Sequence, residues 1–247
     1  MMNDTIKVIQ DHRSIRNFLD KDVDDSTIDE ILKSAQSMPN SINGQQTSVI
    51  VIRDKKKKAR IAELCGNQHW IEEAPVFLVF IMDFYKTDLA AKKNGLTQVA
   101  HESVEGIITG SFDGGLLMGG AIISAESLGL GIVPIGGVRK NPQELIELLN
   151  LPEYTYPLVG LAVGYPKDHS HKKPRMPFET FRHNESYKAE GMEEVIDQYD
   201  HDMESYLKEQ GLEKEGNWSK LTSRIYQSVY YPEVYPTLKS QKFSNNK

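Results

Sequence analysis

QVAHESVEGIITGSFDGGLLMGGAIISAESLGL, residues 98–130, contains no proline and predicts the longest helix of the chain. Glycine inside an isolated helix costs about 1 kcal/mol relative to alanine, so a helix this rich in glycine needs support from elsewhere. Five glycines lie in its middle part: Gly110, Gly114, Gly115, Gly119 and Gly120. Small residues at this spacing let another backbone come close. We therefore expect a central helix that packs on a sheet or on a second subunit.

Apolar runs on both sides of this tract predict strands. TSVIVIRD (47–54) is rich in β-branched residues, and APVFLVFIMDF (74–84) is apolar on both faces, as in a buried strand. IVPIGGVR (132–139) and YPLVGLAVGYP (156–166) predict two more. Helical spacing predicts further helices over residues 4–11, 24–38, 55–66, 141–150, 191–210 and 218–239. The expected N-caps are Asp4 or Thr5, Asp25 or Ser26, and Asn141.

The bulk composition excludes several classes of function. The chain has 247 residues and a net charge of −6, so a basic nucleic-acid-binding stripe is not expected. The longest mostly apolar runs, VFLVFIM and LVGLAVG, are too short to cross a membrane, and the N-terminus is too polar for a signal peptide. The single cysteine, Cys65, allows no disulfide within the chain and is expected as a small buried hydrophobe. We therefore expect a cytoplasmic protein.

Several familiar catalytic motifs are absent from the sequence. The seven histidines form no HxxxH or HExxH pair and there is no CxxC, so no metal site is expected. GSFDG (110–114) is not the GxSxG element of serine hydrolases. No GxGxxG follows a strand and no GxxxxGK[ST] occurs, which argues against a Rossmann or P-loop nucleotide site.

Three separate clusters of cationic and small residues remain as candidate ligand-binding elements. Arginine presents a planar fork to phosphate oxygens, serine adds a hydroxyl donor, and glycines let backbone N–H groups approach a flat ligand. Each cluster alone is more typical of a solvated surface cation or a turn glycine than of a ligand site. The clusters are His12, Arg13, Ser14 and Arg16; then Ile135, Gly136, Gly137 and Arg139; then Lys173 and Arg175.

Four ordered blocks give these clusters a family context. They are DHRSIRNF (11–18), SAQSMPNSINGQQ (34–46), AESLGLGIVPIGGVRKNP (125–142) and KKPRMP (172–177). Together they resemble the nitroreductase superfamily, most closely its oxygen-insensitive nitroreductases and bacterial NAD(P)H:flavin oxidoreductases. The resemblance implies an α+β fold, with a central, mostly antiparallel sheet flanked by helices. It also implies one FMN-binding domain over residues 1–247 and a homodimer, with a C-terminal segment, about residues 190–247, packing on the partner subunit.

The resemblance also implies roles for individual residues. His12, Arg13 and Ser14 match phosphate and ribityl contacts, and Arg16 matches the cation near the polar edge of the flavin. Gln68 matches a ring contact, and Trp70 is expected to border the pocket. The remaining matches are Ile135, Gly136 and Gly137 (backbone donors), Arg139 (the following cation), Lys173 and Arg175 (a second phosphate clamp), and Asn40, Ser41 and Gln45 (a loop beside the ring). That loop reads PNSIN where the family branch often has a run of serines.

The activity implied by the resemblance is ping-pong hydride transfer from NAD(P)H to FMN and on to nitroaromatics, quinones or free flavin. No side-chain acid is required, and Arg16 is the candidate for electrostatic support of the flavin. Two alternatives remain open: a flavin carrier without turnover, and a related flavin enzyme with different chemistry. The loop KEQGLEKEGNW (208–218) contains no arginine and three glutamates, which suits a free ribose 2′-OH, so NADH is an expected cosubstrate beside NADPH.

Overall fold

The computed structural model describes residues 3–244 and 246. The described chain falls into two compact units. Unit 1 comprises the residues up to Ser170 together with those from Tyr231 onward, and unit 2 comprises His171–Tyr230. The prediction that they act as one domain, completed by a partner subunit, stays a prediction.

Unit 1 is built on a four-stranded antiparallel sheet in the order β1-β2-β4-β3. The strands are β1 (Thr47–Ile52), β2 (Val76–Asp83), β3 (Gly131–Ile135) and β4 (Thr155–Gly164). In register, β2 pairs with β1 at Phe80–Val49 and with β4 at Leu78–Leu161. The predicted α+β fold with a central antiparallel sheet is therefore confirmed.

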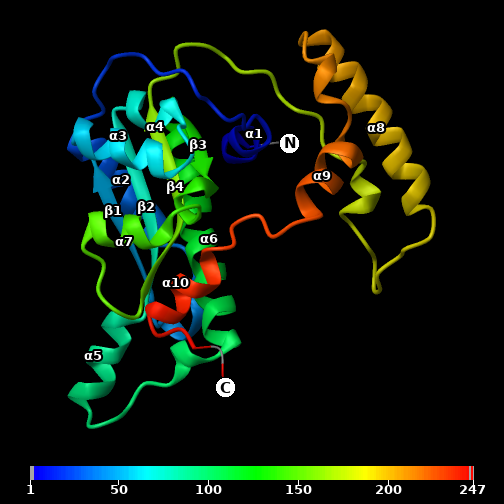
Figure 1. Ribbon diagram of the computed structural model, residues 1–247. Coiled ribbons are helices and arrows are strands. Elements are labelled where there is room, and N and C mark those ends of the chain that lie inside the picture. The colour runs from blue at the N-terminus through cyan, green and yellow to red at the C-terminus, as the bar shows by residue number, and fades with distance from the viewer. Residues whose placement is uncertain (1–2, 245, 247) are drawn as a thin grey trace. The chain divides into compact units, whose positions relative to one another are not determined.

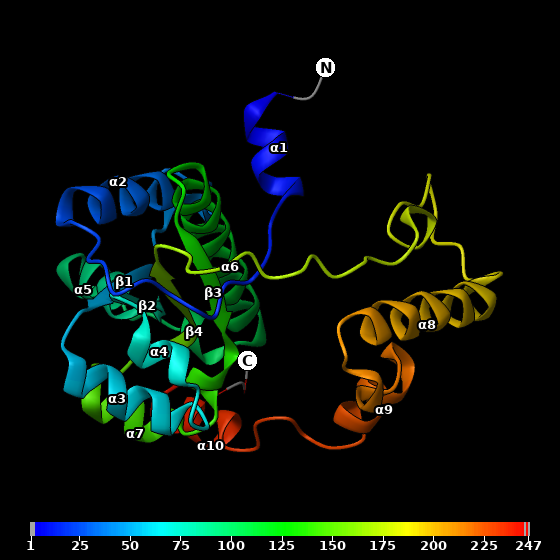
Figure 2. The same ribbon diagram turned by 90° about the horizontal axis from the view of Figure 1, so that it is seen from above.

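Helices cover both faces of this sheet, as Figures 1 and 2 show. One face carries α2 (Asp25–Gln36) and α6 (Val104–Ser127), and the other carries α3 (Lys55–Leu64), α4 (His69–Glu73) and α7 (Pro142–Leu149). Side chains alternate along β2: Phe77 and Val79 enter the core under α3 and α7, whereas Leu78 and Phe80 enter the core under α2 and α6. Every residue of β2 is buried, which explains its continuous apolar run.

The glycines of α6 divide between two faces. A Cβ on Gly110 would lie 2.6 Å from Met82 Sδ, one on Gly114 2.4 Å from Leu158 Cδ1, and one on Gly120 2.6 Å from Met38 Cγ. These glycines therefore allow the close approach of the helix to the sheet and to α2, as predicted. Gly115 and Gly119 instead face open space. Within the described chain, the helix leaves this second face uncovered.

α6 is the one helix, among the residues described, that is long and apolar enough by length and composition to cross a membrane. Core helices pass the same test, so the observation is weak evidence for a membrane span. Here the helix carries the buried Asp113 and packs on the sheet and on α2. Its start is later than predicted, because Ala100–Glu102 forms a separate 3₁₀ turn and Ser103 caps α6 by accepting from Gly106 N.

The remaining helices of unit 1 are α1 (Asp4–Gln10), α5 (Tyr85–Lys93) and α10 (Val234–Ser240), with short 3₁₀ turns at Ser41–Asn43 and Gly136–Arg139. The caps of α1 and α2 are Asn3 and Asp24, each one residue before the earlier predicted position. The helices α4 and α5 were not predicted. After α10, Phe243 is fully buried beside Met82, so this last part of the chain packs on its own subunit.

Unit 2 consists mainly of α8 (Met192–Glu209) and α9 (Trp218–Tyr226), with 3₁₀ turns at Phe178–Thr180 and Glu213–Glu215. Tyr199 and Trp218 pack edge to face with ring centroids 5.9 Å apart. The predicted helix over 218–239 is wrong: α9 ends at Tyr226 and α10 starts at Val234. Pro232 lies in the break, where a proline lacks the N–H that a continuous helix needs.

Candidate functional site

The N-terminal cluster lies along β3, an edge strand of the sheet. Ser14 forms a parallel bridge with Ile132, and Ile15 N donates to Ile132 O at 2.8 Å. Ile15 is buried, and a Cβ on Gly131 would lie 2.7 Å from its Cγ1 atom, so this segment is held tightly against the strand. Because β3 continues into the Gly136–Arg139 turn, the same strand carries both the first and the second predicted cluster.

Acidic residues hold two side chains of the first cluster, His12 and Arg13. His12 Nδ1 lies 2.6 Å from Glu126 Oε1, and Arg13 Nη2 lies 2.5 Å from Asp11 Oδ1. Both the His12 and the Arg13 side chains remain about a quarter exposed, at 27% and 26%. A pocket of about 390 Å³ opens here, and its lining includes Arg13, Glu126 and His169. The cluster therefore has donors fixed in position and space for a ligand beside them.

Arg16 lies on the other side of this segment, over the indole of Trp70. The guanidinium carbon is 5.5 Å from the ring centroid, within the range of a cation–π interaction. Trp70 Nε1 is buried and has no hydrogen-bond partner among the described residues. An unpaired buried N–H beside an exposed arginine is a donor set that a polar ligand edge would satisfy.

Gln68 and Gly137 pack directly on each other. Gln68 Nε2 donates to Cys65 O at 2.8 Å. A Cβ on Gly137 would lie 2.5 Å from Gln68 Nε2 and 2.8 Å from Cys65 O, so only glycine fits there. A Cβ on Gly136 would meet nothing closer than Arg139 Nη2 at 3.3 Å. The structure thus explains Gly137 by packing within the chain, and backbone donation to a ring by Ile135, Gly136 and Gly137 stays a prediction.

Arg139 is anchored inside unit 1. Its Nη1 donates to Leu158 O, and its guanidinium carbon lies 5.6 Å from the ring centroid of Tyr231. Burial raises the pKa of the nearby Tyr156 hydroxyl, and the positive charge of Arg139 opposes that rise. Arg139 therefore stabilises the fold at this end of the sheet, in addition to any contact with a ligand.

The loop of Asn40, Ser41 and Gln45 is strained and strongly anchored. Ile42, Asn43 and Gln45 have φ values of 50°, 56° and 51°, which are unfavourable for residues other than glycine. Asn40 Oδ1 accepts from Gln45 N at 3.0 Å. Ser41 N donates to Asp113, at 3.2 Å to Oδ1 and 3.1 Å to Oδ2.

The carboxylate that anchors this loop is itself buried in α6. Asp113 is 1% exposed, and its Oδ2 also accepts from Gln46 Nε2 at 2.6 Å. The backbone and a side chain of the loop are therefore tied to one point on the helix. Between these ties Ile42 is 95% exposed, so the loop projects an apolar side chain away from its own subunit.

Two family profiles match the chain. The one described as "Nitroreductase family" matches residues 9–165, and the one described as "Nitroreductase family, C-terminal domain" matches residues 173–246. The chain belongs to the nitroreductase family. The two matches fall largely within unit 1 and unit 2 respectively.

Curated relatives within the nitroreductase family align over nearly the whole chain. "FMN reductase [NAD(P)H]" of Bacillus subtilis is 44% identical and covers 100% of both chains. "NADPH-flavin oxidoreductase" of Vibrio harveyi is 31% identical and covers 97% of this chain and 98% of that protein.

Solved structures of the family agree closely with the fold. NfrA2 of B. megaterium superposes with a TM-score of 0.97 at 47% identity, covering 100% of both chains. The NADPH:FMN oxidoreductase from V. harveyi, solved as a complex with NAD+, gives a TM-score of 0.89 at 30% identity, covering 99% of this chain and 100% of that one.

The residues along β3 fit the cofactor expected for a nitroreductase. A phosphorylated flavin needs cationic and hydroxyl donors for its phosphate, which His12, Arg13 and Ser14 offer, and polar donors for its ring edge. The unpaired Nε1 of Trp70 and the adjacent Arg16 are of that second kind. Lys173 and Arg175 are exposed in unit 2, so their part in a phosphate clamp stays a prediction.

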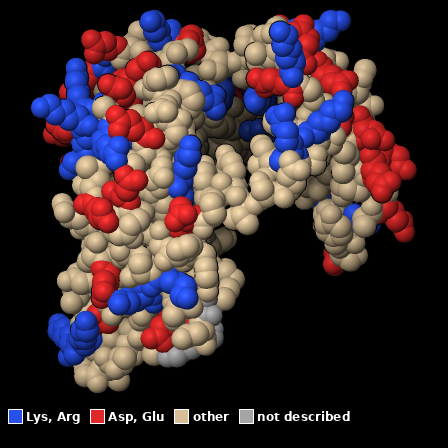
Figure 3. Space-filling view, viewed as in Figure 1, with Lys and Arg blue, Asp and Glu red and all other residues tan. Residues whose placement is uncertain are grey.

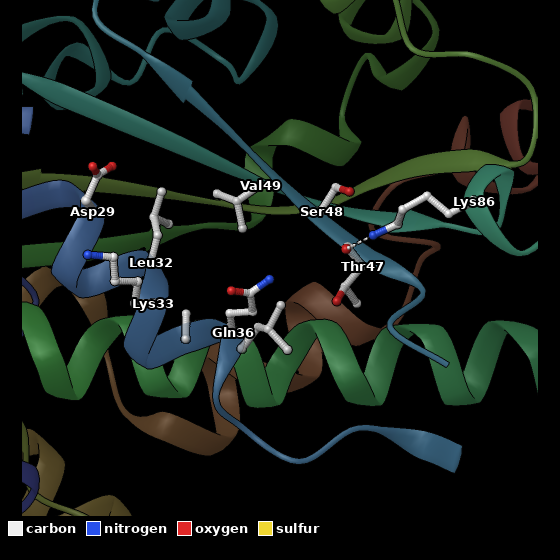
Figure 4. Close-up of a pocket in the computed structure, with 10 residues that line it drawn as sticks. Asp29, Leu32, Lys33, Gln36, Thr47, Ser48, Val49 and Lys86 are labelled. Atoms are coloured by element: carbon white, nitrogen blue, oxygen red, sulfur yellow. Dashed lines mark hydrogen bonds between the residues drawn. The ribbon is translucent and has the colours of Figure 1, made fainter. Parts of the chain in front are cut away.

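A larger pocket, of about 470 Å³, lies elsewhere in unit 1 (Figure 4). It is lined mainly by α2 and β1 residues, together with Leu117 of α6 and Lys86 of α5. Lys86 Nζ donates to Thr47 O at 2.7 Å. None of the predicted site residues lines it. In the described part of the chain, no group of three or more His, Cys, Asp or Glu side chains could hold a metal ion.

Sequence reasoning missed the two acidic residues that organise this region, Asp113 and Glu126. Both lie in the glycine-rich tract, where a carboxylate among apolar and small residues is the available signal. Their partners are 72 and 114 residues away in sequence, so no local pattern identifies them.

Cys65 gives a first testable prediction. Burial raises the pKa of its thiol from 9.0 to about 12, so at pH 8 the thiolate is about a thousandfold rarer than in an ordinary cysteine. We expect no reaction of the native protein with a thiolate-specific reagent at pH 8, and one equivalent of reaction after denaturation. Rapid labelling of the native protein would contradict the burial.

The same pKa shift predicts how stability depends on pH. An unfolded chain loses the Cys65 proton above pH 9 while the folded chain keeps it to about pH 12, so the folded state loses stability as pH rises through this window. The slope approaches about 1.4 kcal/mol per pH unit. Urea unfolding between pH 9 and 11 should show a shallower decline for Cys65→Ala. The Tyr156 hydroxyl, whose pKa burial also raises, keeps a residual slope in both proteins.

Proposed function

We propose that this protein is an FMN-dependent NAD(P)H oxidoreductase that reduces a small acceptor such as a nitroaromatic, a quinone or free flavin. One observation carries the proposal: a chain of the nitroreductase family places His12, Arg13, Ser14 and Arg16 in one segment along an edge strand. Arg13 lines a pocket, and Arg16 lies over an indole whose N–H has no partner among the described residues. Relatives named as FMN reductase and NADPH-flavin oxidoreductase support it, because the alignments span almost the whole of both chains. When bound, FMN supplies hydride acceptance from the nicotinamide and electron donation to the acceptor in alternate half-reactions.

The side chains of this subunit bind and orient the cofactor in this proposal. His12, Arg13 and Ser14 hold the phosphate and ribityl chain, and Lys173 and Arg175 add a second clamp. Arg16 places positive charge at the polar edge of the ring, where negative charge develops on reduction. Its contact with Trp70 limits the freedom of the guanidinium and so pre-organises that charge.

We further propose that the working form is a homodimer in the cytoplasm. The outer face of α6 exposes Val104, Ile108 and Phe112 at intervals of four residues, continuing to the open Gly115 and Gly119. An apolar stripe of this length on one helix face is typical of a protein–protein interface. By contrast, Figure 3 shows acidic side chains gathered along α8 of unit 2. A second copy of the chain is the occupant that fits the family.

The test of the function is spectroscopic. The purified full-length protein should be yellow, with the absorption bands of FMN, and should bleach without oxygen when NADPH or NADH is added. Re-oxidation by a nitroaromatic, a quinone or free FMN would then identify the class of acceptor. A yellow protein that neither nucleotide bleaches would favour a flavin carrier. A colourless protein that cannot be loaded with FMN would contradict the proposal.

The nucleotide preference is a separate prediction. The 208–218 loop carries Glu209, Glu213 and Glu215 and no arginine, so it offers little to a 2′-phosphate. We expect kcat/KM for NADH to lie within about tenfold of that for NADPH, a difference below about 1.4 kcal/mol. A larger preference for NADPH would contradict this expectation.

Matched variants assign the preference to the loop. Glu213→Gln/Glu215→Gln should raise kcat/KM for NADPH severalfold and leave NADH unchanged, because only NADPH carries the additional negative charge. The control is Glu193→Gln/Glu194→Gln in the first turn of α8, which removes the same charge from the same unit. An equal response of both pairs would indicate a general charge effect.

A further inference from the structure

Glu126 occupies an unfavourable position for a carboxylate. It lies in the last turn of α6, where the helix dipole disfavours negative charge. Its side chain is only 13% exposed. Oε1 lies 2.6 Å from His12 Nδ1, whereas Oε2 is buried without a hydrogen-bond partner among the described residues. A buried unpaired oxygen and a charge at the wrong end of a helix both lower stability. Glu126 therefore lowers the stability of the fold, and among the described residues its contact with His12 is the interaction that offsets this loss.

The contact with Glu126 decides which nitrogen of His12 is available. An ionised carboxylate can only accept hydrogen bonds, so the proton of the shared contact belongs to Nδ1. This leaves Nε2 as the nitrogen that can face a ligand, and within the described chain it makes no hydrogen bond. With both ring nitrogens protonated, Nδ1 donates to Glu126 and Nε2 donates outward.

The adjacent cation is arranged in the same way. Arg13 Nη2 contacts Asp11 Oδ1 at 2.5 Å, and its Nε lies 3.3 Å from Asp11 O. His12 and Arg13 are thus each held by an acid, and each keeps a side-chain nitrogen that the acid does not contact. Both Arg13 and Glu126 line the pocket of about 390 Å³ beside β3. Asp11 lines it too, so the pocket is bordered by Arg13 and by the two acids that fix the cluster in position.

We propose that Glu126 is a positioning residue for the phosphate of FMN. It holds the His12 ring in one orientation, with Nδ1 on the carboxylate, so that Nε2 donates to a phosphate oxygen whenever the ring is protonated. In this proposal Glu126 acts through His12 and makes no hydrogen bond of its own to the phosphate, because a carboxylate would repel it. This inference rests on the proposed FMN-binding function. It adds Glu126 of α6 to the residues on which recognition of the phosphate depends.

The decisive comparison is between FMN and riboflavin, which differ only in the phosphate. Dissociation constants of both are measured for the full-length chain freed of bound flavin, as wild type and as Glu126→Gln. Glutamine keeps the shape of the side chain and removes the charge. We expect the variant to bind FMN at least tenfold more weakly and riboflavin as wild type does. We also expect its unfolding midpoint in urea to be unchanged or higher, because a buried charge at a helix C-terminus has been removed.

Two further variants complete the design. Glu147→Gln makes the same change in the last turn of α7, away from His12, and should alter neither dissociation constant. His12→Asn should weaken FMN binding, and adding Glu126→Gln to it should produce no further loss, because Glu126 acts through His12.

Three results would overturn the inference. The first is an FMN-to-riboflavin affinity ratio in Glu126→Gln within twofold of wild type. The second is an equal loss for both ligands together with a lower unfolding midpoint, which is the pattern of a structural residue. The third is an additive loss in the double variant. A wild-type protein that binds neither flavin would instead refute the proposed function itself, and the inference with it.

Discussion

Phe112→Asp should convert the protein from a dimer to a monomer. Phe112 is 66% exposed on α6, with Ile108 at 58% and Val104 at 53% on the same face. Burying an aromatic side chain contributes about 1.5–3 kcal/mol. A two-fold symmetric interface contains each residue twice, so the loss is doubled. Two buried carboxylates add a desolvation cost, and the dissociation constant should rise by a factor on the order of 10³ or more.

Sedimentation velocity over a range of protein concentrations measures this change directly. The matched control is Leu89→Asp on α5, which introduces the same charge at a side chain that is 48% exposed. We expect the control to remain dimeric. A Phe112→Asp variant that sediments as wild type would show that the outer face of α6 is not the interface. A wild-type protein that is monomeric at micromolar concentration would show that no stable homodimer exists.

Asp113→Ala should destabilise unit 1 and impair catalysis at the same time. The substitution removes the acceptor of Ser41 N and of Gln46 Nε2, at a position that is 1% exposed. Hydrogen bonds to a charged group contribute about 1.5–3 kcal/mol each, and a buried donor left unpaired costs a similar amount. We expect the free energy of unfolding to fall by about 3–5 kcal/mol.

Catalysis should suffer because the strain of the loop is no longer balanced. Ile42, Asn43 and Gln45 hold left-handed backbone angles, each costing roughly 1–3 kcal/mol, and these persist only while the anchors hold. Without Asp113 the loop should relax and cease to present Ile42. Urea unfolding and kcat/KM for NAD(P)H and an acceptor are measured on the same preparations.

A milder substitution separates the two effects. Asp113→Asn retains one acceptor oxygen for Ser41 N, and Gln46 can turn its amide to accept from the new NH₂ group. It should therefore recover most of the stability. Wild-type stability in Asp113→Ala would contradict the role of this carboxylate, and unchanged kcat/KM in a destabilised variant would contradict the role of the loop.

Local patterns were sufficient for the regular elements that face a core. The four strands were predicted because β-branched and apolar runs suit a sheet covered on both faces, and α2 and α3 because their apolar residues recur at helical spacing. Prediction failed where a proline overrode the helical pattern, as at Pro232, and where a helix was very short, as in α4. It also placed two N-caps one residue late, because neighbouring Asn and Asp residues cap equally well.

In the candidate site, too, local patterns were sufficient for some features and not for others. The residue types and the order of HRSIR, IGGVR and KKPR carried the family resemblance, which the family profiles then bore out. The roles of individual residues could not be read from these sequence blocks. Gly137 is explained first by its contact with Gln68 and Cys65, and Arg139 by its bond to Leu158 O. These contacts join segments that are distant in sequence.

The sequence by itself determined the strands, most of the helices and the family, because these depend on residue type and short spacing. It also supplied a candidate set of cations for a phosphorylated flavin. Only the tertiary structure decided that Glu126 stands behind His12, that Asp113 anchors the 40–46 loop, and that α6 divides into a buried and an open glycine face. The physical reason is the short spatial range of the interactions that make these contacts. Hydrogen bonds and steric contacts act over a few ångströms in space, and the folded sheet brings together residues that lie 72 to 114 positions apart in the chain.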